Sequence, residues 1–208
     1  EWTNATVEGN ILTVEDASKP ITYKYDCGCD IYETFTLISP DDLTAGSVAI
    51  SSKNFPDYMF RYNISQEFDT DKDNILSAEE IADVTKLNIS VGGIRELTGI
   101  HYFKNLENLD CSGNKLTTID ISNFTALTRL SCGKNQLTSL DLSNNTALAY
   151  LSCYDNQLTS LDLSNNTALA YLYCYDNQLT SLDVSKNTAL TDLVCSDNQL
   201  TSLDVSNN

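Results

Sequence analysis

Apolar residues recur with a period of 21 residues through the second half of the chain. Five copies of one pattern, L-x-x-L-x-C-x-x-N-x-L-T-x-L/I-D-L/I/V-S-x-N/F-T-A, open at evenly spaced leucines: Leu106, Leu127, Leu148, Leu169 and Leu190. A looser 22-residue copy precedes them from Val84. A repeat of this length indicates a stack of similar units, because one unit cannot bury its apolar side alone.

Each copy contains a short stretch with a period of two. In the third copy, Leu151 and Cys153 alternate with Tyr150 and Ser152. This alternation predicts a β-strand with Leu and Cys pointing inward and Tyr and Ser pointing outward. A second apolar segment, such as Leu158 to Leu163, turns the chain back and completes one coil of a solenoid.

Two polar residues also recur once per copy. An asparagine follows each strand, where a buried amide can satisfy backbone groups of the neighbouring turn: Asn114, Asn135, Asn156, Asn177 and Asn198. An aspartate stands at the fifteenth position, where we expect it to accept turn hydrogen bonds because no acid or base partner recurs beside it: Asp120, Asp141, Asp162, Asp183 and Asp204.

These motifs resemble the leucine-rich repeat. Cysteine at the sixth position, the 21-residue period and the L-T-x-L-D-L-S-x-N segment resemble the cysteine-ladder branch of the internalin family. That resemblance implies a secreted or wall-anchored bacterial surface protein that binds through a concave parallel sheet. The expected fold is an α/β, β-rich right-handed solenoid over residues 84–208, its last repeat incomplete, with a helical cap over 53–83 and a small β element over 1–52.

The cysteines of the repeats form a ladder: Cys111, Cys132, Cys153, Cys174 and Cys195. Parallel strands lie about 4.8 Å apart, but equivalent side chains point the same way and cannot readily reach the torsion of roughly 90° that a disulfide needs. We therefore expect free, buried thiols that act as apolar filler, with redox or metal roles as the alternative. Cys27 and Cys29 form a weak zinc signal, and a local disulfide or two free turn thiols fit them better.

The first 52 residues show no repeat. Residues 6–14 resemble a hairpin around a Gly-Asn turn, and residues 21–25 and 31–38 have the composition of strands. A β element of about fifty residues is small for an independent domain.

The segment before the repeats resembles a 12-residue EF-hand loop, and the internalin resemblance also implies an EF-hand-like cap. The oxygen ligands for Ca²⁺ would come from Asp69, Asp71, Asp73, the Ile75 carbonyl, Ser77 and Glu80. Three closely spaced carboxylates repel one another unless a cation neutralises them. Asn74 replaces the usual glycine and tolerates the left-handed conformation. The alternative is a simple capping box of Ser77 and Glu80.

Helix signals flank this loop. Pro56 and Asp57 suit a helix start, and Phe60, Ile64 and Phe68 then follow as an apolar stripe. Ser77 to Glu80 would begin the exit helix. A single helix–loop–helix at the end of a solenoid is expected to serve as a structural cap.

Tyrosines gather on the outward positions of the third and fourth repeats. Tyr offers apolar area and a hydroxyl at low entropic cost, which suits protein and glycan recognition. The predicted ligand-binding residues are the tyrosines with a neighbouring arginine and two rim carboxylates: Tyr150, Tyr171, Tyr173, Tyr154, Tyr175, Arg129, Asp155 and Asp176. The alternative is that duplication copied exposed tyrosines that bind nothing.

Composition narrows the function classes. The net charge of −17 argues against nucleic acid as a partner, since phosphate binding needs clustered Lys and Arg. Of the 29 acidic residues, 17 precede Val84. The chain has one His and no recurrent nucleophile, which disfavours catalysis. No apolar run is long enough for membrane insertion.

The favoured function is a secreted or cell-surface bacterial binding protein. It would be adhesin-like and monomeric, would recognise a host or matrix protein, mucin or glycan, and would not be an enzyme. The alternatives are the non-catalytic accessory region of a larger secreted carbohydrate-active or proteolytic enzyme, and a passive stalk.

Overall fold

The structure is a computed structural model that describes residues 2–3, 5–8, 11–14, 21–24, 32–35 and 43–208. In the first part, β2 (Ala5–Glu8) and β3 (Ile11–Val14) form an antiparallel hairpin, as predicted. β4 (Ile21–Lys24) pairs with both β1 (Trp2–Thr3) and β5 (Tyr32–Phe35). Cys27, Cys29 and the Gly9-Asn10 turn lie outside the described residues.

A helix–loop–helix segment precedes the repeats. It contains α1 (Tyr58–Glu67), β7 (Ile75–Leu76) and α2 (Ala78–Asp83). Asp57 caps α1 and accepts a hydrogen bond from the Phe60 N–H, which confirms the predicted helix start. β6 (Val48–Ala49) pairs antiparallel with β7, so the chain before residue 53 also contributes to this unit.

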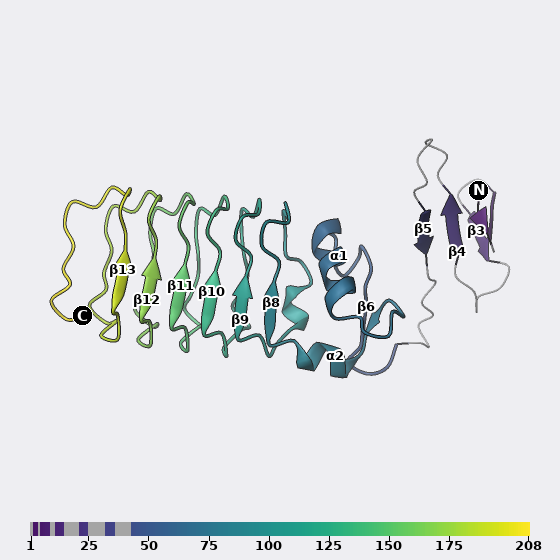
Figure 1. Cartoon of the computed structure of the whole chain (residues 1–208), viewed down its shortest axis with the longest axis horizontal. Helices are drawn as coiled ribbons and strands as arrows, with labels where there is room; N and C mark the ends of the chain where they lie inside the picture. The colour runs from purple at the N-terminus through teal and green to yellow at the C-terminus, as the bar shows by residue number, and fades with distance from the viewer. Residues whose placement is uncertain (1, 4, 9–10, 15–20, 25–31, 36–42) are drawn as a thin grey trace.

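Six strands of the repeats form one parallel sheet along the solenoid (Figure 1). They follow the chain in order: β8 (Lys86–Asn88), β9 (Asn108–Asp110), β10 (Arg129–Ser131), β11 (Tyr150–Ser152), β12 (Tyr171–Tyr173) and β13 (Asp192–Val194). From β9 to β13, each residue pairs with the residue 21 positions later. A short 3₁₀ helix, η2 (Ile100–Tyr102), lies in the first coil.

The interior of the coils is a continuous column of leucines and cysteines. The predicted inward residues of the third coil, Leu151 and Cys153, are fully buried. All five ladder cysteines are free thiols, as predicted; four are buried and Cys195 is half-buried. Burial raises the pKa of Cys111 and Cys174 to about 12, because a thiolate is poorly solvated in the core. These thiols are therefore protonated and unreactive at neutral pH.

Asparagine amides tie each coil to its neighbours. The Asn156 Nδ2 donates to the carbonyls of Cys132 and Cys153 at 3.1 and 3.0 Å, and its Oδ1 accepts from the Leu137 N–H at 3.0 Å. The same bonds recur at the equivalent residues Asn135 and Asn177. The predicted structural role of these asparagines is confirmed.

The aspartates of the repeats form local turns. Asp141 and Asp162 each accept the backbone N–H two residues later at 2.9 Å, and Asp120 also accepts the Ser122 hydroxyl at 2.7 Å. Hydrogen bonds from serine lower the pKa of these carboxyls. The predicted turn role is confirmed.

The cap packs closely on the first coil. Phe55 is fully buried, and its ring centre lies 5.9 Å from that of Phe60 in α1 and 6.4 Å from that of Phe103 in the first coil. Asp57 accepts the Arg95 N–H at 2.8 Å while it caps α1. A Cβ atom at Gly99 would lie 2.4 Å from the Asn54 carbonyl oxygen. This junction therefore joins cap and solenoid into one hydrophobic core.

Candidate functional site

The outward positions of β9 to β13 define the concave face of the repeat sheet. They carry a row of mixed side chains in strict register, at the first and third residues of each strand: Asn108, Asp110, Arg129, Ser131, Tyr150, Ser152, Tyr171, Tyr173, Asp192 and Val194. Because equivalent positions lie one strand spacing of about 4.8 Å apart, side chains of consecutive coils touch.

Tyr150 is the centre of an aromatic cluster on this face. The guanidinium carbon of Arg129 lies 3.5 Å from the centre of the Tyr150 ring, which is a cation–π contact. The rings of Tyr173 and Tyr171 lie 5.6 and 6.2 Å from the Tyr150 ring. The Tyr171 side chain is 45% exposed, so the cluster is open to solvent.

A second tyrosine pair follows the ends of the strands. Tyr154 and Tyr175 stack with ring centres 4.7 Å apart and planes 12° from parallel. A Cβ at Gly133, one coil earlier, would lie 2.5 Å from the Tyr154 ring, so only glycine leaves room for this ring. The stack continues the aromatic surface beyond the strands.

The rim carboxylates Asp155 and Asp176 have a backbone role as well as a charge. Both residues are exposed and adopt the left-handed conformation, with φ of 52° and 53°. Gly113 and Lys134 occupy the same position in earlier coils with φ of 67° and 54°. Aspartate tolerates this conformation better than most residues, which explains its recurrence at the turn.

Two phenols of the patch, those of Tyr173 and Tyr175, have a raised pKa and therefore keep their protons at physiological pH. Burial and the nearby Asp192 carboxylate raise the pKa of Tyr173. Burial and the neighbouring Tyr154 raise the pKa of Tyr175. The face can therefore offer hydroxyl donors and aromatic planes to a ligand. The structure brings all eight predicted binding residues to this side of the solenoid.

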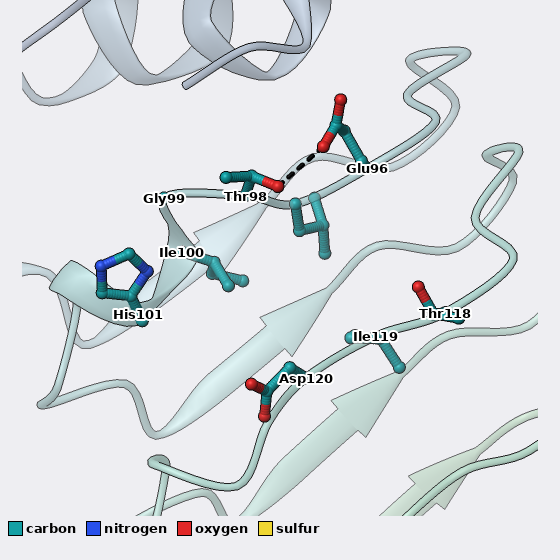
Figure 2. A pocket seen from close by; sticks show the side chains of 9 residues that line it. Glu96, Thr98, Gly99, Ile100, His101, Thr118, Ile119 and Asp120 are labelled. Atoms are coloured by element: carbon teal, nitrogen blue, oxygen red, sulfur yellow. Dashed lines mark hydrogen bonds between the residues drawn. The ribbon is translucent and has the colours of Figure 1, made fainter. Parts of the chain in front are cut away.

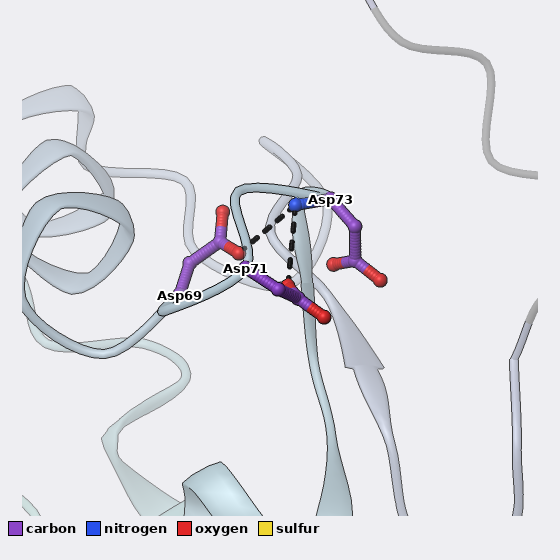
Figure 3. Close-up of side chains that lie close together, drawn as sticks. All are labelled: Asp69, Asp71 and Asp73. Atoms are coloured by element: carbon purple, nitrogen blue, oxygen red, sulfur yellow. Dashed lines mark hydrogen bonds between the residues drawn. The ribbon is translucent and has the colours of Figure 1, made fainter.

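The three loop carboxylates also come together, as Figure 3 shows. Oxygens of Asp69, Asp71 and Asp73 lie within 4.8 Å of one another. Asp69 is 2% exposed and accepts the Asp73 and Asn74 N–H groups at 3.1 and 3.2 Å. Burial raises the pKa of Asp69, which means that its charge is poorly compensated. Asn74 has a φ of 64°, the left-handed conformation expected at this loop position.

The remaining predicted ligands of the loop have protein partners. The two Glu80 carboxylate oxygens accept from Thr70 and from Ser77, with the Thr70 N–H at 2.7 Å and the Ser77 N–H at 2.9 Å. Ser77 and Glu80 form the capping box that the sequence offered as the alternative to a calcium site, and Ile75 belongs to β7. Burial raises the pKa of Glu80, but these hydrogen bonds outweigh it and lower the pKa to about 2.

A shallow pocket of about 310 Å³ lies near the first coil (Figure 2). Its lining includes Glu96, Thr98, His101 and Asp120. The Thr98 hydroxyl donates to Glu96 at 2.7 Å, and the His101 ring lies 4.2 Å from the Tyr102 ring. The pocket contains no second histidine, and its carboxylates already accept protein hydrogen bonds. It therefore presents no acid–base or nucleophilic arrangement.

The comparisons with known proteins agree with this geometry. The family of leucine-rich repeats in two copies matches residues 104–148. Internalin J of Listeria monocytogenes is 41% identical to this chain over 83 residues, which are 40% of the chain and 9% of internalin J. The chain thus spans a small part of the curated relative that it matches. The repeats are leucine-rich repeats stacked into a solenoid.

Solved structures extend the match to most of the chain. The functional domain of InlJ from Listeria monocytogenes, described as including a cysteine ladder, is 36% identical with a TM-score of 0.64 over 78% of this chain and 41% of that one. An internalin, InlF, from the same species is 28% identical with a TM-score of 0.70 over 76% of this chain and 48% of that one. The protein is an internalin-like leucine-rich-repeat protein with a cysteine ladder.

The described part of the chain holds no helix with the length and hydropathy that a bilayer span requires.

Proposed function

We propose that this chain is the binding region of a secreted or cell-surface bacterial protein. It recognises a protein or glycan through the concave face of the repeat sheet, in the manner of an adhesin. The observation that carries this proposal is the aromatic surface in which Arg129, Tyr150, Tyr171 and Tyr173 contact one another across β10 to β12. The similarity to internalin J supports an extracellular location on a bacterium.

The chemistry of the surface fits recognition rather than catalysis. Half-buried tyrosines supply apolar area while their hydroxyls remain available for hydrogen bonds. Phenols beside exposed carboxylates do not form the paired acid and base that a reaction would need. The chain spans only part of the length of its relatives, so the function of the whole protein is also a proposal.

A binding array tests the concave face. Wild-type protein and a Tyr150→Ser, Tyr171→Ser, Tyr173→Ser variant are applied to immobilised mucins, mucin glycans and extracellular matrix proteins. The variant should lose attachment by tenfold or more, because anchor residues of this kind carry about 2 kcal/mol each. The control variant carries Tyr58→Ser and Tyr62→Ser on α1, where both tyrosines are exposed and remote in sequence from the repeats.

Two results would contradict the proposal. One is equal attachment of the wild type and the concave variant to a ligand that both bind. The other is equal loss in the α1 control. Circular dichroism confirms that each variant retains its fold before the arrays are compared.

We also propose that the loop binds one structural Ca²⁺. Asp69, Asp71 and Asp73 would supply oxygens, with the Ile75 carbonyl, Ser77 and Glu80 completing the set after Glu80 leaves Thr70. The three gathered carboxylates fit an ion that prefers oxygen ligands, and the bound charge would relieve their mutual repulsion. The ion would stiffen the loop between α1 and α2.

Thermal unfolding tests the ion. Millimolar CaCl₂ should raise the melting temperature relative to EGTA in the wild type, and Asp71→Asn should abolish this rise. Asp71 is exposed, so its substitution perturbs the empty loop less than a change at buried Asp69. Asp204→Asn is the charge-matched control and should keep the full rise. Superimposable wild-type curves with CaCl₂ and EGTA would refute the calcium site.

A further inference from the structure

The concave face has a step between β12 and β13. Three tyrosines of the fourth repeat meet three smaller side chains of the fifth repeat 21 residues later, and we name these six residues the tyrosine ledge: Tyr171, Tyr173, Tyr175, Asp192, Val194 and Ser196. The register pairs Tyr171 with Asp192 and Tyr173 with Val194. Because the residues on the fifth repeat are shorter, the sides of the tyrosine rings that face them are less covered.

At the opposite edge of the same aromatic surface, a tyrosine ring contacts a cationic side chain. There Arg129 precedes Tyr150 by one strand, and its guanidinium carbon lies 3.5 Å from the ring centre. The negative face of an aromatic ring attracts a cation, and the attraction grows as water is removed. At the ledge the strand neighbour of Tyr171 is Asp192, an anion, so the chain supplies no equivalent cation at that position.

The charge around the ledge is one-sided. Asp176, Asp192 and Asp197, in the fourth and fifth repeats, are all exposed on or just beyond the strands. Lys186 is the one basic residue in the sequence after Lys134. It interacts with Asp183, which belongs to the turn rather than to the strands. The ledge therefore combines aromatic planes with uncompensated carboxylates.

We propose that the tyrosine ledge binds a cationic side chain, the guanidinium of Arg or the ammonium of Lys, from an exposed segment of a protein ligand. The inference rests on the proposed function and narrows its ligand to a protein with a basic contact residue. The cation lies against the tyrosine rings, and Asp192 compensates its charge. Asp192 interacts with the Tyr173 hydroxyl, so this carboxylate is held beside the rings.

A pair of matched probes tests the ledge. Acetyl-arginine N-methylamide and acetyl-citrulline N-methylamide have nearly the same shape, but only the first carries a charge. Tyrosine ring signals of ¹³C-tyrosine-labelled protein are followed by NMR during titration in 150 mM NaCl, which screens remote charges. We expect saturable shifts at Tyr171, Tyr173 and Tyr175, with an affinity for arginine about threefold or more above that for citrulline.

Two carboxylate variants provide the control. Asp192→Asn keeps a hydrogen-bond acceptor beside Tyr173 and removes the charge, so it should lower the affinity for the arginine probe about threefold or more. Asp204→Asn removes an equal charge from the same repeat at a turn, where the carboxylate accepts the Ser206 N–H. It should leave the titration unchanged.

The inference is overturned by equal affinity for arginine and citrulline, by an unchanged titration in Asp192→Asn, or by shifts that appear only with a neutral probe such as N-acetyllactosamine. If the arrays show attachment that depends on the concave tyrosines while arginine and citrulline bind alike, the ledge fails and the proposed function stands. If the ledge selects arginine while the concave variant attaches to every array ligand as the wild type does, the proposed function fails separately.

Discussion

Replacing Asn156 by alanine should cost far more stability than replacing Asn165, an asparagine of the same coil. Asn156 is buried, and it accepts the Leu137 N–H and donates to two carbonyls. Those carbonyls keep a second amide donor, because Asn135 also donates to Cys132 and Asn177 also donates to Cys153. Among the described residues the Leu137 N–H has no other acceptor, so it would be left unsatisfied in the core.

The magnitude follows from these bonds. A buried N–H without an acceptor costs about 1 to 3 kcal/mol, and each lost amide bond about 0.5 to 1.5 kcal/mol. With two amide bonds lost, Asn156→Ala should therefore lower the free energy of unfolding by about 2 to 6 kcal/mol. Asn165 is exposed and donates only to the Ser143 carbonyl at 3.2 Å. Its replacement should cost about 0.5 kcal/mol or less.

Urea denaturation followed by far-UV circular dichroism measures the difference. Both variants delete the same side-chain atoms, so helix and strand propensities and unfolded-state effects are closely matched. If the two variants unfold at the same urea midpoint, the asparagine ladder contributes little, and the assignment of coil cohesion to these amides is wrong.

Three further changes have expected outcomes. In the same urea assay, Gly99→Ala should lower the free energy of unfolding by about 2 to 5 kcal/mol, because the new Cβ would collide with the Asn54 carbonyl. Gly93 also has a positive φ, but a Cβ there would have no atom within 4 Å, so Gly93→Ala should cost about 1 kcal/mol. Val91→Gly should raise the melting temperature and add about 0.5 to 1 kcal/mol, since this exposed β-branched residue adopts a φ of 57°. Glu80 has its pKa lowered to about 2, so its stabilising contribution is present above an unfolded pKa near 4.5 and is lost as pH falls toward 2. The difference in melting temperature between wild type and Glu80→Gln should therefore shrink from pH 6 to pH 2.

The periodicity of the sequence was sufficient to predict much of the fold. It predicted the strand register and the structural asparagines, because both depend on spacing along the chain. It also predicted the free cysteines, because equivalent side chains on parallel strands cannot readily reach the torsion that a disulfide needs. It also predicted the start of α1 at Asp57, since a cap is a local signal.

Other features depend on contacts that spacing does not reveal. A second buried ladder donates to backbone carbonyls: Asn145, Asn166 and Asn187. Asn145 and Asn166 are each the second asparagine of an Asn-Asn-Thr triplet, in which only that second residue is buried, and Asn187 follows Lys186 at the same repeat position. The pairing of β6 with β7 joins segments more than twenty residues apart without a shared motif.

The sequence predicted which residues form the proposed binding surface, but it did not predict the contacts between their side chains. Alternation along each strand placed the tyrosines outward, yet the Arg129 contact with Tyr150 and the Tyr154 ring over Gly133 depend on rotamers. In the loop, the sequence assigned Glu80 to the ion, whereas the structure places its carboxylate on Thr70 and Ser77. Ser77 lies three residues before Glu80 and was recognisable as a capping-box partner, whereas Thr70 lies ten residues before Glu80 and shares no local motif with it.

The two coils over residues 135–155 and 156–176 differ only at Ser152 and Tyr173. The bonds that join Asn156 to neighbouring coils span fixed sequence separations of 24 and 19 residues, and those of Asn166 span 24 and 21 residues. If one 21-residue unit is removed or inserted at this boundary, every asparagine still finds a bonding partner of the same residue type. An insertion or deletion of another length would disrupt both asparagine ladders. Homologous recombination between the two coding segments would produce such units in frame. Duplication or loss of a repeat can therefore change the distance between the cap and the tyrosine ledge by one strand spacing at a time, while the fold stays the same.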